Sequence, residues 1–501
     1  MGGPPSRTHD LTSPKMTRRR GAAALMLAAL VACSLPAWAA AAAKSPTPDA
    51  RATPYEPAGP WPQFQLDPQH SGALPEGPAP PYKQSWRFDA PGDAGVSGPV
   101  ISGETVYAVG DTAVYALDLA SGSQLWSVER ASGPLATPAV ASPSGGHGPD
   151  ILLYLEGGGK ESGLVALDTT TQQQLWSTPL EGDVFAGVAL DGTLAFVGND
   201  LGKVFAVDIA SGDVAWSTLA VKGNIGSIPA VDGGDVLYPV VNAGTGELTI
   251  VALSEETGAV DWKSLPGPLN AASSSVAAVD GLIFAVVGGY VNGTVVGLRD
   301  GKLLWQSVIR APASPASSSA FDGSLYVADY GGGIYGLHPE TGKRDWDYQV
   351  NETRQARSSP VVSGGAVVVG FEDGRLVAVD PATGELSWEG ASGGGSLKAI
   401  ALAPGSLVVA KGGAGGGLVA FENDPAGRLL HQVSPTTMVP AKVALNFVAA
   451  LLLVVIPAYL FGRLLGPRLL GRVQGEAEEA EEAGEAGTGT EEEDEGDGGA
   501  G

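Results

Sequence analysis

Short apolar runs of about five residues, separated by turn residues, recur along the chain between residues 61 and 423. In the first complete unit, PVIS and TVYAVG lie on either side of Gly103, and VYALDLASGSQLW follows them. Later units carry an Asp-Gly pair at the same bend, at 191–192, 280–281 and 322–323. Asp-Gly between β-rich runs is a strong hairpin signal. Each unit therefore predicts four short antiparallel strands, which make one blade of a β-propeller.

A tryptophan ends each unit, at intervals of 40 to 50 residues. The eight positions are Trp86, Trp126, Trp176, Trp216, Trp262, Trp305, Trp346 and Trp388. Such a period indicates one supersecondary unit repeated along the chain. A large aromatic residue at one position of every blade suits packing between blades, so we interpret these tryptophans as structural.

The ends of the repeat region predict how the ring closes. Seven complete units separate Trp86 from Trp388, and three further strands follow without a tryptophan. A lone strand, KQSWRFD, precedes the first complete unit and carries Trp86. Placing that strand fourth in the last blade removes the exposed edges at both ends. The expected fold is all-β, an eight-bladed propeller of four-stranded antiparallel blades closed by the N-terminal strand.

The closing phrases resemble the repeats of the pyrroloquinoline-quinone-type, or quinoprotein-like, propeller family, with the form Ala-x-Asp-x-x-Thr-Gly-x-x-x-Trp. The segment WPQFQLDPQHSG, residues 61–72, is similar to the lead-in that commonly precedes such propellers. The resemblance covers residues 61–423. It implies a fold more than an activity, because the family contains cofactor-dependent dehydrogenases and also non-enzymatic members such as the outer-membrane assembly lipoprotein BamB.

The N-terminal 39 residues have the layout of a secretory signal peptide, with three arginines before an apolar run and small residues at Ala37-Trp38-Ala39. Two questions stay open here. The run before Cys33, the single cysteine, also matches a lipidation pattern, and either Met1 or Met16 can be the start. Residues 40–60 are rich in Ala, Pro, Ser and Thr, so a flexible linker is expected there.

The C-terminal part predicts a membrane anchor. A linker, 424–442, leads to twenty uncharged residues, 443–462, long enough for a transmembrane helix. Arginines dominate the following flank, which predicts a single-pass protein of the cytoplasmic membrane with the propeller outside and residues 463–501 in the cytoplasm. The tail from residue 474 holds twelve acidic residues and no basic one, so we expect it to be disordered, with a basic cytoplasmic partner as the functional alternative.

The residue inventory bears on catalysis. The resemblance implies that a dehydrogenase of this family would hold pyrroloquinoline quinone with calcium, often beside paired cysteines. The repeat region has no cysteine, the five histidines of the chain are scattered, and no carboxylate cluster stands out beyond the turns. We therefore expect no catalysis and no cofactor or metal. A quinone- and calcium-dependent dehydrogenase and a BamB-like envelope assembly factor are the alternatives.

Binding is the remaining class of function. The net charge of −25 disfavours nucleic acid as a partner. Connections between blades are mostly small and neutral, but some carry charge and are expected to gather on one face of the ring. These candidate residues are Lys222, Glu352, Arg354, Arg357 and Lys398. A cluster of cations on an acidic protein can receive an anionic group of a small ligand or a protein partner. We expect an extracytoplasmic binding, scaffold or sensing module.

Overall fold

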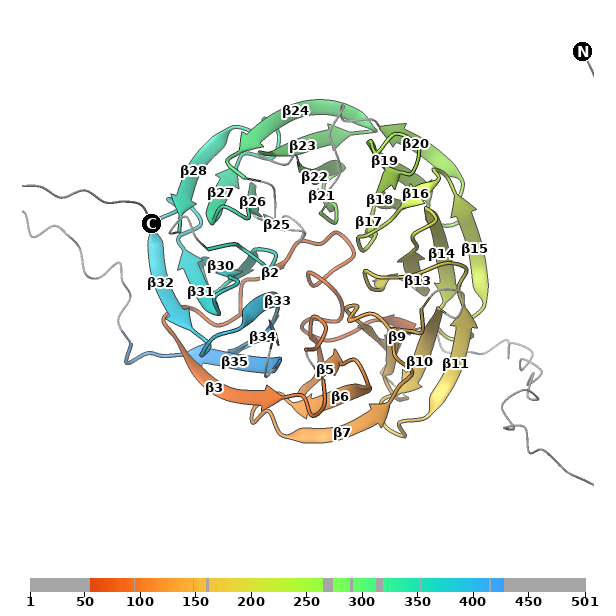
Figure 1. The fold of residues 1–501 in the computed structure, drawn as a ribbon, viewed down its shortest axis with the longest axis horizontal. Coiled ribbons are helices and arrows are strands. Elements are labelled where there is room, and N and C mark those ends of the chain that lie inside the picture. The colour runs from red at the N-terminus through yellow and green to blue at the C-terminus, as the bar shows by residue number, and fades with distance from the viewer. Residues whose placement is uncertain are drawn as a thin grey trace, which may run out of the picture. The chain divides into compact units, whose positions relative to one another are not determined.

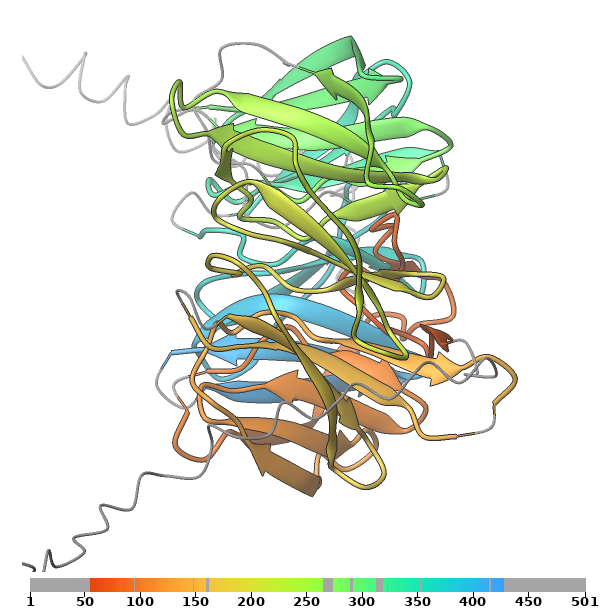
Figure 2. The same cartoon turned by 90° about the vertical axis from the view of Figure 1, so that its right-hand side faces the viewer.

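The described residues of the computed structural model form a closed ring of eight blades (Figure 1). They run from 55 to 427, except 94, 147, 159–161, 265–273, 289–291, 312–318, 322, 351–353 and 414–415. All belong to one compact unit that begins at Ala52, and they contain strands and turns but no helix. The predicted all-β, eight-bladed propeller is confirmed, and Figure 2 shows the same ring from the side.

The first four blades follow one another along the chain. Blade 1 has β4 (Val100–Ser102), β5 (Thr105–Val109), β6 (Ala113–Asp118) and β7 (Gln124–Glu129). Blade 2 has β8 (Ala139–Pro143), β9 (Ile151–Glu156), β10 (Gly163–Asp168) and β11 (Gln174–Pro179). Blade 3 has β12 (Ala189–Asp191), β13 (Leu194–Gly198), β14 (Lys203–Asp208) and β15 (Val214–Leu219). Blade 4 has β17 (Ala230–Asp232), β18 (Asp235–Asn242), β19 (Leu248–Ser254) and β20 (Val260–Ser264).

The other four blades complete the ring. Blade 5 has β21 (Ala277–Val279), β22 (Leu282–Gly288), β23 (Gly293–Arg299) and β24 (Lys302–Ile309). Blade 6 has β25 (Ser319–Phe321), β26 (Ser324–Ala328), β27 (Gly333–Leu337) and β28 (Arg344–Gln349). Blade 7 has β29 (Val361–Ser363), β30 (Ala366–Gly370), β31 (Arg375–Val379) and β32 (Leu386–Ala391). Blade 8 has β33 (Ser396–Ala403), β34 (Ser406–Gly412), β35 (Gly417–Asn423) and β3 (Tyr82–Asp89).

The strand from the start of the repeat region closes the ring as predicted. β3 pairs antiparallel with β35, from Tyr82 opposite Asn423 to Asp89 opposite Gly417. It forms the outer strand of blade 8, whose three other strands come from the end of the repeat region. The early and late parts of the chain are therefore joined by strand pairing, and blade 8 has an outer strand like every other blade.

Three short strands extend the expected four-stranded pattern. β1 (Tyr55–Pro57) pairs with β8, β16 (Gly223–Asn224) pairs with β18, and β2 (Ala73–Leu74) pairs in parallel with β29. β1 lies within the stretch 40–60 that the sequence assigned to a flexible linker, so that assignment is corrected at its end. The reason is that the innermost strand of a blade has a free edge, and its backbone groups can pair with any extended segment along the axis.

The hydrophobic core is a series of layers between neighbouring blades. One cluster joins blades 1 and 2, and further clusters join each following pair around the ring. The middle strands are buried on both faces, as in β6, whereas the outer strands alternate between exposed and half-buried side chains, as in β7. This explains why the middle strands read as continuous apolar runs in the sequence.

The repeated tryptophans pack between blades. The indole Nε1 of Trp346 in blade 6 donates to the Pro381 carbonyl in the closing turn of blade 7, at 2.8 Å. The same bond to the next blade is made by Trp86, Trp176, Trp216 and Trp305. Across its own blade each tryptophan faces an alanine or glycine, such as Ala116 opposite Trp126. The small residue leaves room for the indole ring, which accounts for the first and last positions of the repeated phrase.

Residues 55–74, called here the N-terminal segment, cross the middle of the ring (orange in Figure 1). Backbone or side-chain oxygens of the segment accept from the N–H of the second residue of the inner strand in six blades. The donors are Ile101, Val140, Leu190, Val231, Ala278 and Val362. An inner strand is the free edge of its blade, and an unpaired buried N–H is costly, so the segment stabilises six blades at once.

No helix long and apolar enough to span a membrane occurs among residues 55–427, as far as the structure describes them. The predicted signal peptide, Cys33, the predicted span 443–462 and the acidic tail lie outside the described residues.

Candidate functional site

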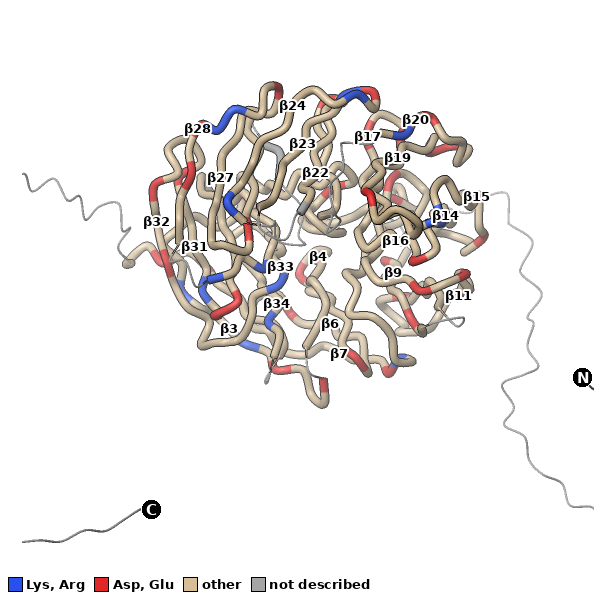
Figure 3. The backbone as a smooth tube through the Cα atoms, turned by 45° about the horizontal axis from the view of Figure 1, so that its top comes forward, with Lys and Arg blue, Asp and Glu red and all other residues tan. Residues whose placement is uncertain are grey.

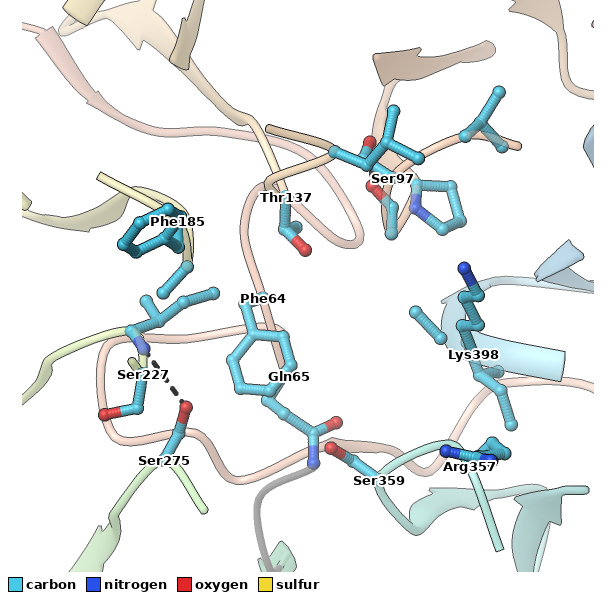
Figure 4. Close-up of a pocket in the computed structure, with 18 of the residues that line it drawn as sticks. Phe64, Gln65, Ser97, Thr137, Phe185, Ser227, Ser275, Arg357, Ser359 and Lys398 are labelled. Atoms are coloured by element: carbon cyan, nitrogen blue, oxygen red, sulfur yellow. Dashed lines mark hydrogen bonds between the residues drawn. The ribbon is translucent and has the colours of Figure 1, made fainter. Parts of the chain in front are cut away.

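A pocket of about 690 Å³ lies on the axis of the ring. Its walls come from the connections that lead into the inner strands of blades 1, 2, 3, 4 and 5, from the inner strand β33 of blade 8, and from Arg357, Ser359 and Glu372 of blade 7. Trp61, Phe64 and Gln65 of the N-terminal segment also line it, and Figure 4 shows Phe64 and Gln65 on the ribbon that crosses its middle. The volume is in the range typical of small-molecule sites. The N-terminal segment, held by its six hydrogen bonds to the inner strands, thus forms the floor of this pocket.

The floor is held by specific contacts. Trp61 is fully buried and exchanges backbone hydrogen bonds with Ile101 of blade 1. Gln65 Nε2 donates to the Pro360 carbonyl of blade 7 at 3.2 Å. Phe64 packs edge to face on His70, with ring centroids 5.0 Å apart. Trp61 and Gln65 are thus tied to blades 1 and 7, and Phe64 also packs against the cluster between blades 3 and 4, so the floor has one defined position.

The pocket has one net positive charge. Among its lining residues the ionisable side chains are Arg357, Glu372 and Lys398. Arg357 donates twice to Glu372, at 3.1 and 2.7 Å, and its guanidinium stacks on Tyr330 at 5.2 Å. Lys398 is exposed and has no hydrogen bond or ion pair with a described residue. Figure 3 shows basic positions on the neighbouring strands β33 and β34.

Two hydroxyl groups of the lining lack partners among the described residues. Ser227 and Ser359 are only 4% and 6% exposed, yet their Oγ atoms make no hydrogen bond. By contrast, Ser275 Oγ accepts from the Ile228 N–H at 3.2 Å, the dashed line in Figure 4. Buried hydroxyls are nearly always hydrogen-bonded, so unpaired ones beside a pocket mark places where a ligand or water can bind.

The structure brings together only part of the predicted cation cluster. Arg357 and Lys398 both line the pocket. Arg354 is instead bound to Asp373 and Glu389, at 2.9 and 2.7 Å, so its charge is neutralised within blade 7. Lys222 does not line the pocket and lies in the connection between β15 and β16. Glu352 lies outside the described residues.

The lining does not fit a calcium-held quinone, the cofactor that the propeller family implies. Calcium needs six to eight oxygen ligands, several of them carboxylates. The pocket has one carboxylate, Glu372, and it is engaged by Arg357. Within the described part of the chain no three acidic, histidine or cysteine side chains gather as a metal site would require.

Sequence reasoning missed the floor and the hydroxyl groups of this pocket. The segment WPQFQLDPQHSG was recognised only as a lead-in, and nothing in its composition indicates that it crosses the axis. A partial signal was that the polar residues Gln63, Gln65 and His70 stand close to the large aromatic residues Trp61 and Phe64. Ser227 and Ser359 stand in connections that contain serine, as most connections between blades do, so spacing alone does not distinguish them.

Comparison with known proteins identifies the family. The model of the family described as outer membrane protein assembly factor BamB matches residues 81–160, 160–322 and 315–434. The BamB protein of Moranella endobia is 26% identical over 54% of this chain and 73% of its own length. That of Yersinia pestis is 28% identical over 45% of this chain and 61% of its own length, less than two thirds.

Solved structures agree on the fold. The crystal structure of BamB from Moraxella catarrhalis superposes with a TM-score of 0.52 at 18% identity and covers 69% of this chain and 99% of that one. Enzymes also occur among the relatives, such as a polyvinylalcohol dehydrogenase from a Pseudomonas species, 25% identical over 70% of each chain.

These matches correct one prediction from the sequence. A single-pass protein of the cytoplasmic membrane was expected, but the matched family and its BamB relatives are named for the assembly of outer membrane proteins. The predicted span itself, residues 443–462, lies outside the described residues. With the family model matching nearly the whole ring, the chain belongs to the BamB family of pyrroloquinoline-quinone-type propellers.

Proposed function

We propose that this protein is a non-catalytic binding module that serves outer membrane protein assembly, the role that its BamB relatives are named for. The observation that carries the proposal is the match of the BamB family model to residues 81–434, which takes in every blade of the ring. A propeller of this kind offers a rigid surface made of many connections, which suits a protein partner. This proposal narrows the binding, scaffold or sensing role expected from the sequence to a role in outer membrane protein assembly.

A quinone-dependent dehydrogenase is the competing proposal, because polyvinylalcohol dehydrogenase is among the relatives. The chemistry of the axial pocket favours the binding module. General acid–base or metal-assisted oxidation needs a titratable group or a metal site facing the substrate. The one carboxylate in the lining pairs with Arg357, and the remaining ionisable group is an exposed lysine.

The test is a deletion of the gene in the host, followed by quantitative proteomics of isolated outer membranes. We expect β-barrel proteins to fall at least twofold while lipid-anchored proteins stay constant, and the full chain supplied in trans should restore them. An affinity-tagged full chain should also retain a protein of the barrel assembly machinery after mild cross-linking.

Two results would overturn the proposal. One is an unchanged set of barrel proteins in the deletion strain. The other is dye reduction with alcohols by the purified full chain after addition of pyrroloquinoline quinone and calcium. The second result would favour the dehydrogenase, because turnover requires a catalytic site that the binding module lacks.

A further inference from the structure

We infer that the axial pocket is a binding site for a small aromatic monocarboxylate. The chemistry of this pocket differs from one wall to the other. In Figure 4, Lys398 and Arg357 lie on one side and Phe185 lies on the opposite side, with Phe64 between them. The inference about this pocket stands whether or not the protein takes part in outer membrane assembly.

The charge of the pocket selects a monoanion. Arg357 is compensated by Glu372, so Lys398 supplies the one uncompensated charge among the lining residues. A carboxylate beside the ammonium group forms a charge-assisted hydrogen bond, which is stronger than a neutral one. A dianion or trianion would leave charge unpaired in a pocket with a mostly apolar floor.

The two unpaired hydroxyls indicate where polar atoms of the ligand lie. Ser359 is on the same side as Arg357, between it and Gln65, and Ser227 is on the side of Phe185 (Figure 4). Both Oγ atoms are buried without a partner among the described residues. We place the carboxylate between Lys398 and Ser359, where the hydroxyl donates to the second carboxylate oxygen. A ring hydroxyl, where the ligand has one, then reaches Ser227.

The apolar part of the pocket selects an aromatic body. Phe64 stands in the middle of the floor, and Phe185 is 47% exposed although it faces the pocket. Leu135 and Ile228 also line the pocket. A large exposed aromatic side chain beside a pocket gains from covering by a ligand ring, and aromatic pairs favour such contacts beyond simple burial.

The experiment is isothermal titration calorimetry of the full chain with 3-phenylpropionate as the probe. Its neutral amide, 3-phenylpropionamide, has the same shape without the charge. We expect the acid to bind with a dissociation constant in the range of about 1 mM or tighter, and the amide at least tenfold more weakly. Equal binding of the acid and the amide, or no binding of the acid, would overturn the inference.

Variants distinguish the proposed contacts from a general effect of charge. Lys398→Ala should weaken binding of 3-phenylpropionate at least tenfold, whereas Lys222→Ala removes a cation outside the pocket and should leave it unchanged. Ser359→Ala should weaken binding about threefold or more without lowering the melting temperature of the free protein, because the hydroxyl has no partner to lose. Identical losses for Lys398→Ala and Lys222→Ala would contradict the site.

Discussion

At the scale of single residues, the tryptophan of one blade and the turn glycine of the next form one packing unit. Gly384 has φ +71°, and a Cβ there would lie 2.5 Å from Cε3 of Trp346. Gly122, Gly212 and Gly258 stand in the same relation to Trp86, Trp176 and Trp216. Blade 2 departs from the pattern, because Gln172 occupies the glycine position with φ +57°. The glycine therefore serves both the turn and the indole ring.

Replacing Gly384 by alanine tests this dual role. Positive φ costs an alanine about 1 kcal/mol, and the clash with the indole ring adds roughly 1–3 kcal/mol. Gly365 is the matched control, with φ +77° and open space around a Cβ. Urea unfolding should show Gly384→Ala losing clearly more stability than Gly365→Ala. Equal losses would mean that the turn geometry alone requires the glycine.

Histidine 70 predicts a loss of stability in acid. Burial lowers the pKa of His70 to about 4. The hydrogen bond between its Nδ1 and the Val276 carbonyl raises the pKa, but by less than burial lowers it. The other ring nitrogen, Nε2, has no partner among the described residues. The folded state thus favours neutral His70. Its contribution to the free energy of unfolding is complete above pH 6.5, the pKa in the unfolded chain, and is lost as the pH falls toward 4. The full effect is on the order of 3 kcal/mol.

Unfolding of wild type and His70→Asn at pH 7 and at pH 4.5 measures this contribution. Asparagine is chosen because His70 has φ +61° and asparagine tolerates that conformation. The variant should lose less stability than wild type on acidification. His338→Asn changes a histidine in an exposed turn and should keep the pH dependence of wild type. A variant at position 70 as acid-sensitive as wild type would contradict the assignment.

At the scale of elements, the N-terminal segment replaces a missing neighbour for the inner strands. Gln63 illustrates how, since its Nε2 donates to the Leu190 carbonyl at 3.0 Å and its Oε1 accepts from the Leu190 N–H at 2.6 Å. The side-chain amide thereby imitates one residue of a paired strand. The segment binds mostly through backbone atoms elsewhere, which is why an irregular sequence can contact six blades.

The variant Gln63→Leu removes both bonds and leaves two buried backbone groups of Leu190 unpaired. We expect a loss of roughly 2–4 kcal/mol and faster amide hydrogen exchange at Leu190. Gln69→Leu is the control, because Gln69 contacts Ala278 through its backbone carbonyl at 2.9 Å and keeps that bond. Protection at Leu190 that survives the first substitution would show that water replaces the side chain.

How far the sequence predicts this molecule depends on whether a feature repeats. The strands and hairpins were predictable because apolar runs and turn residues, often Asp-Gly, recur at one period. The closing strand was predictable because its Trp86 continues the same series of tryptophans. The pocket was not, because its floor comes from a segment that occurs once. Arg354 shows the same limit, since the sequence indicates a charged connection but not that Asp373 and Glu389 neutralise it.

At the scale of the whole molecule, β3 and the N-terminal segment couple the blades. A linear array of repeats unfolds in parts, because each repeat contacts only its neighbours. Here β3 joins the two ends of the array, and the N-terminal segment contacts blades that are far apart in the sequence. We expect one cooperative unfolding transition, with tryptophan fluorescence and far-ultraviolet circular dichroism giving the same midpoint.

The variant Trp86→Ala tests the coupling at the junction where the ring closes. It removes a side chain that is 7% exposed and its bond to the Leu119 carbonyl, at a cost of roughly 3–5 kcal/mol. The whole transition should move to lower urea concentration while staying single. A separate early transition that accounts for a fraction of the signal would show that blade 8 opens alone.

The placement of β3 also sets an order in time. Its partner β35 ends at Asn423, more than 330 residues later in the chain, so the first blade strand to be synthesised waits for the last one. Until β35 emerges, β3 lacks its partner and its edge is open to other strands. A newly made chain therefore needs protection from wrong pairing through almost the whole of its synthesis.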